Sequence, residues 1–79
     1  MKTIKLGKYK HYKGNFYEVY GLAVHTESEE RLVLYKACYS LPKLEAELGP
    51  APYFVRPYEM FLEQIEIDGK LIDRFSFVE

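Results

Sequence analysis

Two histidines and a glutamate are the side chains of this sequence with the most versatile chemistry, namely His11, His25 and Glu27. Imidazole and carboxylate groups exchange protons near neutral pH and also bind metals. The histidines fall in separate expected strands, however, and a structural zinc site takes four ligands where this chain has one cysteine. We therefore expect no metal and no cofactor. Each histidine either hydrogen-bonds a backbone carbonyl or Glu18 at a strand end, which is the commoner use, or contacts a ligand.

An arginine stands between Val55 and Pro57 and is the second residue of interest. Proline restricts the backbone of the residue before it, so Arg56 is held locally. The planar guanidinium matches a carboxylate or a phosphate. Two interpretations stay open: Arg56 anchors an anionic ligand, or it forms an internal ion pair with an acid such as Glu27 or Glu59.

Aromatic rings and lysines are concentrated in the first half of the chain. Small β domains often stack nucleic-acid bases on such rings, while lysines meet the phosphates. The alternative is that the rings complete a small core with their hydroxyls in water. We expect at least two of the tyrosines to line an exposed groove. The residues concerned are Tyr9, Tyr12, Tyr17, Tyr20 and Tyr35, with Lys8, Lys10 and Lys13.

No catalytic motif supports an enzyme. The sequence contains no glycine-rich phosphate loop, no G-x-S-x-G, no H-E-x-x-H and no paired cysteines. We therefore assign no catalytic residue. Cys38 is expected to lie mid-strand beside Leu34 as a buried, inert thiol.

Length and charge narrow the classes of partner. The chain has 79 residues, 48% of them hydrophobic, which predicts a single domain over residues 1–79. Residues 1–14 hold five lysines and no acid, whereas residues 59–79 hold six acids, and the formal net charge is -1. That balance lacks the broad positive field of a strong nucleic-acid binder, so we expect no DNA partner.

The expected compartment is the cytoplasm. A single cysteine excludes an internal disulfide and favours a reducing environment. The lysine-rich start does not resemble a signal peptide, and no stretch approaches the ~20 apolar residues of a membrane span. We expect no membrane partner.

Turn signals divide the chain into short elements. Strands are expected at residues 7–12, 16–25, 31–39 and 53–56, with a bulge or bend at Gly21. Proline and glycine bracket a short helix within residues 40–52, and one helical turn follows Pro57. Asp68-Gly69 predicts a hairpin between residues 62–67 and 70–75. A two-residue loop would set Ile65 opposite Ile72 and Glu63 opposite Arg74.

This order of elements favours a mostly β fold, a small, strongly bent SH3-like barrel of five to six strands with one or two short helical turns. Closing such a sheet would remove its exposed edges.

Three motifs resemble the bacterial domain of unknown function family 1653 over nearly the whole chain. They are "GKYKHYKG", "AVHTE" and "VRPYEMF". The matching positions are Gly7, Tyr9, His11, Tyr12, Lys13 and Gly14, then Ala23, His25, Thr26 and Glu27, then Val55, Arg56, Pro57, Met60 and Phe61. Family members usually pass quickly from the third strand to V-R-P, and this chain has a longer connection there. The resemblance implies a mostly β domain and no established activity.

Three functions follow as alternatives. The first is a non-enzymatic binding module for an anionic ligand, either RNA, a nucleotide or an acidic peptide. Its expected ligand-binding residues are Tyr9, His11, Tyr12, Lys13, His25, Glu27, Tyr35 and Arg56. The second is a small-molecule enzyme that uses His11, His25 and Glu27 as acid–base groups, which requires these side chains to converge. The third is a structural protein that forms a homodimer through its aromatic surface.

Overall fold

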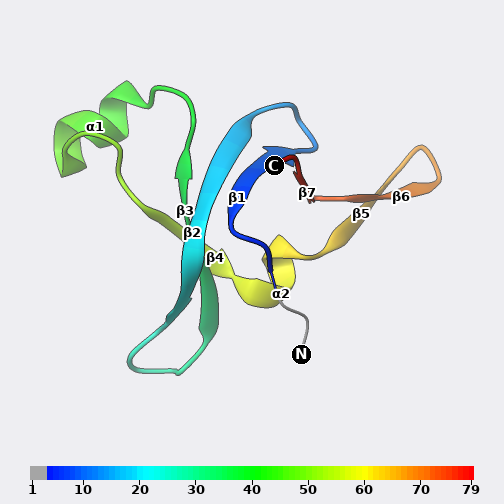
Figure 1. Cartoon of the computed structure of the whole chain (residues 1–79), viewed down its shortest axis with the longest axis horizontal. Coiled ribbons are helices and arrows are strands. Elements are labelled where there is room, and N and C mark those ends of the chain that lie inside the picture. The colour runs from blue at the N-terminus through cyan, green and yellow to red at the C-terminus, as the bar shows by residue number, and fades with distance from the viewer. Residues whose placement is uncertain (1–3) are drawn as a thin grey trace.

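The computed structural model describes residues 4–79 as seven strands and two short helices (Figure 1). In chain order they are β1 (Gly7–His11), β2 (Phe16–Val24), β3 (Arg31–Ala37), α1 (Pro42–Leu48), β4 (Phe54–Pro57), α2 (Tyr58–Phe61), β5 (Gln64–Ile67), β6 (Lys70–Asp73) and β7 (Phe75–Phe77). The mostly β class is confirmed.

Five strands form one antiparallel sheet in the order β4-β3-β2-β1-β7, and β5 and β6 form a separate hairpin. The expected strand 70–75 is divided in two. Its first part stays in the hairpin, while Phe75 begins β7 and lies opposite His11 of β1. Figure 1 shows the hairpin projecting from the sheet on the side away from α1.

The expected irregularity near Gly21 is confirmed as a β-bulge. Val19 pairs with Tyr35, but Gly21 pairs with Leu34, so Tyr20 is the extra residue on β2. A bulge bends its strand and increases the local twist. This bend belongs to the curvature of the whole sheet.

The hairpin register is confirmed. Ile65 pairs with Ile72, and the loop residues Asp68 (φ 52°) and Gly69 (φ 79°) both have the positive φ of a type I′ turn. Just outside the paired residues, Arg74 Nη2 lies 2.7 Å from Glu63 Oε1. The backbone N–H of Arg74 also donates to the Glu63 carbonyl at 3.0 Å. This pair fixes the base of the hairpin where the chain enters β7.

The core lies on the inner face of the curled sheet. The helix α2 covers it and packs against β3 and β4. Rings dominate it: Phe61 of α2 stacks on Phe75 of β7 with centroids 4.1 Å apart. The buried residues are Tyr9, Val19, Val33, Tyr35, Tyr58, Phe61 and Phe75. Large rigid rings let a short chain fill its interior with few residues.

The SH3-like barrel is not confirmed. Within residues 4–79 no ladder joins β4 to β7, so the sheet stays open at these two edges. It is nevertheless strongly curled. Four strand spacings would separate β4 from β7 by about 19 Å in a flat sheet. Yet the guanidinium carbon of Arg56, on β4, lies 5.4 Å from the ring centroid of Phe75, on β7.

The short helix of the long connection is confirmed as α1. Pro42 opens it, and the backbone N–H of Gly49 closes it with a hydrogen bond of 2.9 Å to the Glu45 carbonyl. The helix buries none of its residues fully, and Leu48 is exposed. No helix within residues 4–79 is long and apolar enough to cross a bilayer.

The expected burial of Cys38 is wrong, because its side chain is exposed. β3 ends at Ala37, two residues short of the expected end. Strand alternation sets Val33 and Tyr35 toward the core, so Cys38 falls on the outer face. Sequence alternation separated the two faces correctly but could not show that nothing covers the outer one here.

Candidate functional site

His11, at the end of β1, is surrounded by rings. It lies opposite Phe75 in the β1–β7 ladder, with ring centroids 4.9 Å apart. Tyr12 stacks against its other side at 4.5 Å, and Tyr17 of β2 lies 6.3 Å away. The strand ladders therefore hold the imidazole at the rim of the core, half-buried and half in water.

Arg56 reaches the same rim from the opposite edge of the sheet. Its guanidinium lies over the Phe75 ring, and Nε is 3.5 Å from the Tyr35 hydroxyl. The internal ion pair with Glu27 or Glu59, which was the alternative to an anion anchor, is not formed: the ion pair found within residues 4–79 joins Arg74 and Glu63. The two terminal nitrogens of this half-buried arginine thus have no hydrogen-bond partner in the described part of the chain.

The surroundings of His11 disfavour its charged form. Burial lowers the pKa of the imidazole below its usual 6.5, and the positive charges of Arg56, Arg74 and Lys13 lower it further, in that order. Its Nδ1 accepts the backbone N–H of Lys13 at 3.2 Å. In the neutral ring the proton is therefore on Nε2. His11 consequently presents a hydrogen-bond donor beside the Arg56 cation.

Two tyrosine hydroxyls complete this rim. Tyr17 and Tyr39 share a hydrogen bond of 2.7 Å between their hydroxyl oxygens, and either can be the donor. Burial, the Tyr39 hydrogen bond and neighbouring tyrosines raise the pKa of Tyr17 well above its usual range. Tyr17 is therefore a neutral phenol at physiological pH. We call the group of His11, Tyr17, Arg56 and Phe75 the Arg56–His11 site.

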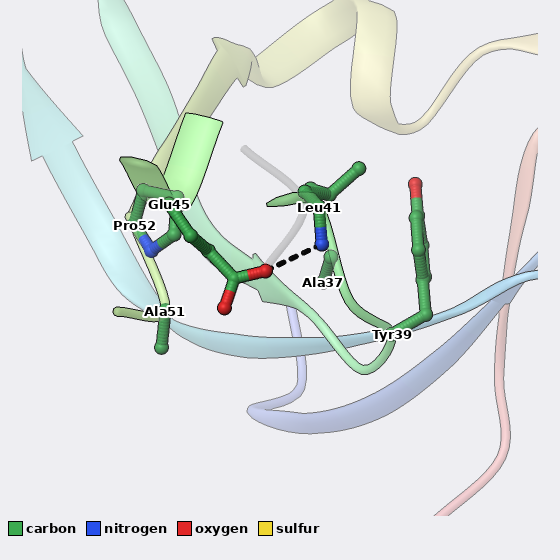
Figure 2. A pocket seen from close by; sticks show the side chains of 6 residues that line it. All are labelled: Ala37, Tyr39, Leu41, Glu45, Ala51 and Pro52. Atoms are coloured by element: carbon green, nitrogen blue, oxygen red, sulfur yellow. Dashed lines mark hydrogen bonds between the residues drawn. The ribbon is translucent and has the colours of Figure 1, made fainter. Parts of the chain in front are cut away.

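A shallow pocket of about 90 Å³ opens next to Tyr39, between the end of β3 and α1 (Figure 2). The Glu45 carboxylate lies on one side, where Oε2 accepts the backbone N–H of Leu41 at 2.6 Å and the Ser40 hydroxyl at 3.1 Å. The lining residues are Ala37, Tyr39, Leu41, Glu45, Ala51 and Pro52.

His25 and Glu27 do not join this site. They follow the far end of β2, and nine residues of strand span about 30 Å. His25 Nδ1 accepts the backbone N–H groups of Glu27 at 3.2 Å and Ser28 at 3.3 Å, while the Glu27 carboxylate accepts the Thr26 hydroxyl at 2.5 Å. Both side chains thus stabilise the β2–β3 turn, and the convergence with His11 that an acid–base set requires is not formed.

The other expected binding residues divide between core and surface. Tyr9 and Tyr35 are only 6% exposed and belong to the core. The Tyr9 hydroxyl donates to the Lys5 carbonyl at 2.8 Å, and that of Tyr35 faces Arg56. Tyr12 is half-buried against His11, and the ammonium of exposed Lys13 lies 5.8 Å from its ring centroid. Tyr12 and Lys13 therefore border the site, whereas Tyr9 and Tyr35 support it.

Sequence reasoning missed Phe75 and Tyr39. Phe75 is the ring on which Arg56, His11 and Tyr17 converge. The short alternation Phe-Ser-Phe at residues 75–77 was a usable signal for a further strand. Tyr39 shares a strand face with Tyr35 in the expected alternation, which was also sufficient to include it.

A metal site finds no support in the described part of the chain. No three His, Cys, Asp or Glu side chains between residues 4 and 79 lie close enough together to hold a metal ion. The groups that do converge at the rim are hydrogen-bond donors and cations.

The fold and the site define a class of small, mostly β domain in which a curled antiparallel sheet brings an arginine, a histidine and several rings together at one rim. The model of the family described as "Protein of unknown function (DUF1653)" matches residues 7–77, so the chain belongs to this family. The resemblance inferred from the three motifs is thereby confirmed.

A solved structure of the same family supports the fold. The crystal structure of a DUF1653 protein from Bordetella bronchiseptica is 28% identical to this chain and superposes with a TM-score of 0.80. The match covers 99% of this chain and 91% of the other. No curated protein matches the chain.

Proposed function

We propose that the domain is a non-enzymatic binding module whose Arg56–His11 site holds the anionic group of its ligand. The observation that carries the proposal is the half-buried Arg56 guanidinium with two unpartnered terminal nitrogens. The terminal nitrogens are not among the fully buried unpaired atoms, so they remain accessible, and a carboxylate or phosphate offers two oxygens that match the arginine fork. Binding an anion would supply these nitrogens with a partner.

The neighbouring groups support an anion rather than a cation. Neutral His11 offers an N–H at Nε2, and the Tyr17–Tyr39 pair offers one free hydroxyl proton. Lys13 adds positive charge at the border. Donors of this kind favour a phosphate or carboxylate, while the face of Tyr12 is suited to stack against a base or another ring.

The overall charge of the protein favours a ligand that is recognised by a single anionic group. With a formal net charge of -1, the protein lacks the field that holds a long nucleic-acid strand. We therefore place a small ligand with a single phosphate or carboxylate group, a mononucleotide included, ahead of RNA and of an acidic peptide. The single thiol, Cys38, keeps the cytoplasm as the proposed compartment.

The test is a titration of the ¹⁵N-labelled protein with inorganic phosphate, AMP and a short single-stranded RNA. Amide shifts are expected at His11, Tyr12 and Arg56 and are expected to vanish in Arg56→Gln. Arg31→Gln is the matched control, because it removes the same charge from an exposed position near the other end of β2. If the shifts are the same in both variants, the site is misassigned.

A salt series distinguishes the ligands. A mononucleotide carries no condensed counterions, so its affinity should fall only weakly with salt, whereas a strand that contacts several phosphates releases counterions and gives a steep slope of log K against log salt. We expect the shallow slope. If no probe causes shifts at any concentration, the aromatic surface as a homodimer face becomes the better explanation, and the solution mass then decides.

A further inference from the structure

The pocket beside Tyr39 is adjacent to the Arg56–His11 site on the same inner face of the sheet. Ala37, which lines the pocket, is the ladder partner of Tyr17, and Tyr39 is hydrogen-bonded to the Tyr17 hydroxyl. The centroids of the two tyrosine rings are 5.6 Å apart. A ligand bound at Arg56 can therefore extend across this tyrosine pair into the pocket.

The pocket differs from the Arg56–His11 site in charge. Its polar group is the Glu45 carboxylate, whose Oε2 is held by Leu41 and Ser40 while Oε1 has no hydrogen-bond partner within residues 4–79. Figure 2 shows the Glu45 carboxylate directed toward the Leu41 backbone nitrogen, with Tyr39 on the far side of Leu41. A carboxylate fixed by two donors and left with one free oxygen is an acceptor for an ammonium group.

The pocket has room for a small polar group. A cavity of about 90 Å³ holds several water molecules, so an ammonium on a short methylene stem also fits into it. The apolar walls formed by Ala37, Leu41 and Pro52 suit the methylene stem.

From this pairing of opposite charges we propose that the ligand is zwitterionic: its anionic group binds at Arg56 and a primary amine on a short stem binds at Glu45. The inference rests on the proposed function, because the first contact is the Arg56–His11 site. It narrows the ligand class to compounds that carry a phosphate or carboxylate and, a short chain away, an amino group. Aminoalkyl phosphates and amino acids share this chemistry.

The test compares aminoalkyl phosphates of two to six carbons with alkyl phosphates of equal length, by NMR titration of the full chain. At one chain length the amine is expected to tighten binding about tenfold or more, the usual size of a charged hydrogen bond. The amides of Leu41 and Glu45 are then expected to shift together with those of His11 and Arg56. Amino acids of the same lengths reveal whether a carboxylate replaces the phosphate.

Glu45→Gln is the decisive variant. The amide oxygen can still accept from Leu41 and Ser40, but the charge is lost, so the preference for the amine should vanish while alkyl phosphates bind as before. Glu47→Gln, exposed on the same helix, is the matched control and should keep the preference.

The outcomes separate the two proposals. Equal affinity for both series, or a preference that survives Glu45→Gln, overturns the zwitterion while the anion site stands. If neither series shifts His11 or Arg56, the proposed function fails and this inference fails with it.

Discussion

At the scale of single residues, the site joins groups that are individually unfavourable. Among residues 4–79 the half-buried guanidinium of Arg56 has no acidic partner, and burial together with nearby positive charges disfavours the charged form of His11. Rings compensate in part, since the Phe75 face attracts the Arg56 cation. Groups with perturbed electrostatics of this kind are frequent at functional sites, which agrees with the proposed role of Arg56 and His11.

Removing the Arg56 charge should raise the pKa of His11. Burial is the largest cause of the lowered pKa and remains in Arg56→Gln, so the value should rise toward 6.5 without reaching it. An NMR pH titration of the His11 ring measures this. Arg31→Gln, a charge change outside the site, should leave the His11 pKa where it is in the unmodified protein.

Removing the hydroxyl from each of two core tyrosines should change the stability of the protein differently. The Tyr58 hydroxyl is buried and has no hydrogen-bond partner among residues 4–79, whereas that of Tyr9 donates to the Lys5 carbonyl. Tyr9→Phe should lower the free energy of unfolding by about 1 kcal/mol, and Tyr58→Phe should leave it unchanged or higher. Urea denaturation of the two variants gives the comparison, and an equal loss in both would contradict the assigned hydrogen bonding.

At the scale of elements, short strands depend on a few backbone positions. β1 begins at Gly7, whose φ is +130°. The Glu79 carbonyl oxygen lies so close to Gly7 that a Cβ atom there would collide with it. The neighbouring backbone N–H of Lys8 donates to that same carbonyl at 2.7 Å. A side chain at residue 7 would separate the segment after β7 from β1.

Gly7→Ala should therefore be more destabilising than Gly14→Ala. Both glycines have positive φ, but a Cβ at Gly14 would meet no atom. Gly14→Ala should therefore lower the free energy of unfolding only by the backbone strain of an alanine at positive φ, about 1–2 kcal/mol. Gly7→Ala adds the collision with Glu79, at least about 1 kcal/mol more. The free energies of unfolding from urea denaturation test the order, and similar losses would mean that the contact with Glu79 is dispensable.

At the scale of the whole molecule, curvature decides where the charges meet. The basic β1 and the arginine of β4 lie at positions far apart along the sheet, and the curled sheet brings both to one rim. Of the acids near the end of the chain, Glu66, Asp68 and Asp73 lie on the hairpin of β5 and β6, which projects from the sheet (Figure 1). At its base Glu63 forms an ion pair with Arg74. Arg56 thereby has no acidic partner among residues 4–79, as the proposed anion site requires.

The stability of the protein should fall as the pH decreases through the titration of His11. Its pKa is lower in the folded state than in the unfolded state, so the unfolded state binds more protons below about pH 6.5. The contribution is fully present above that pH and is lost as the pH falls toward the lowered value. Denaturation between about pH 7.5 and about pH 5.5 should show this slope, and His11→Gln should flatten it. If the pH dependence of stability is the same in His11→Gln as in the unmodified protein, titratable groups other than His11 cause it.

The sequence by itself determined the local features. Asp68-Gly69 set the hairpin and its register, Pro42 and Gly49 bounded α1, and the three motifs identified the family. Each of these depends on backbone preferences or side chains within a few residues of one another, which a linear pattern records.

Only the tertiary structure decided which residues meet. It separated His25 from His11, moved Tyr9 into the core and put Phe75 beneath Arg56. These outcomes depend on the curl of the sheet, to which the Tyr20 bulge and the packing of α2 against the inner face contribute. Curvature of this kind is a sum of small twists and distant contacts, so no single stretch of sequence carries it.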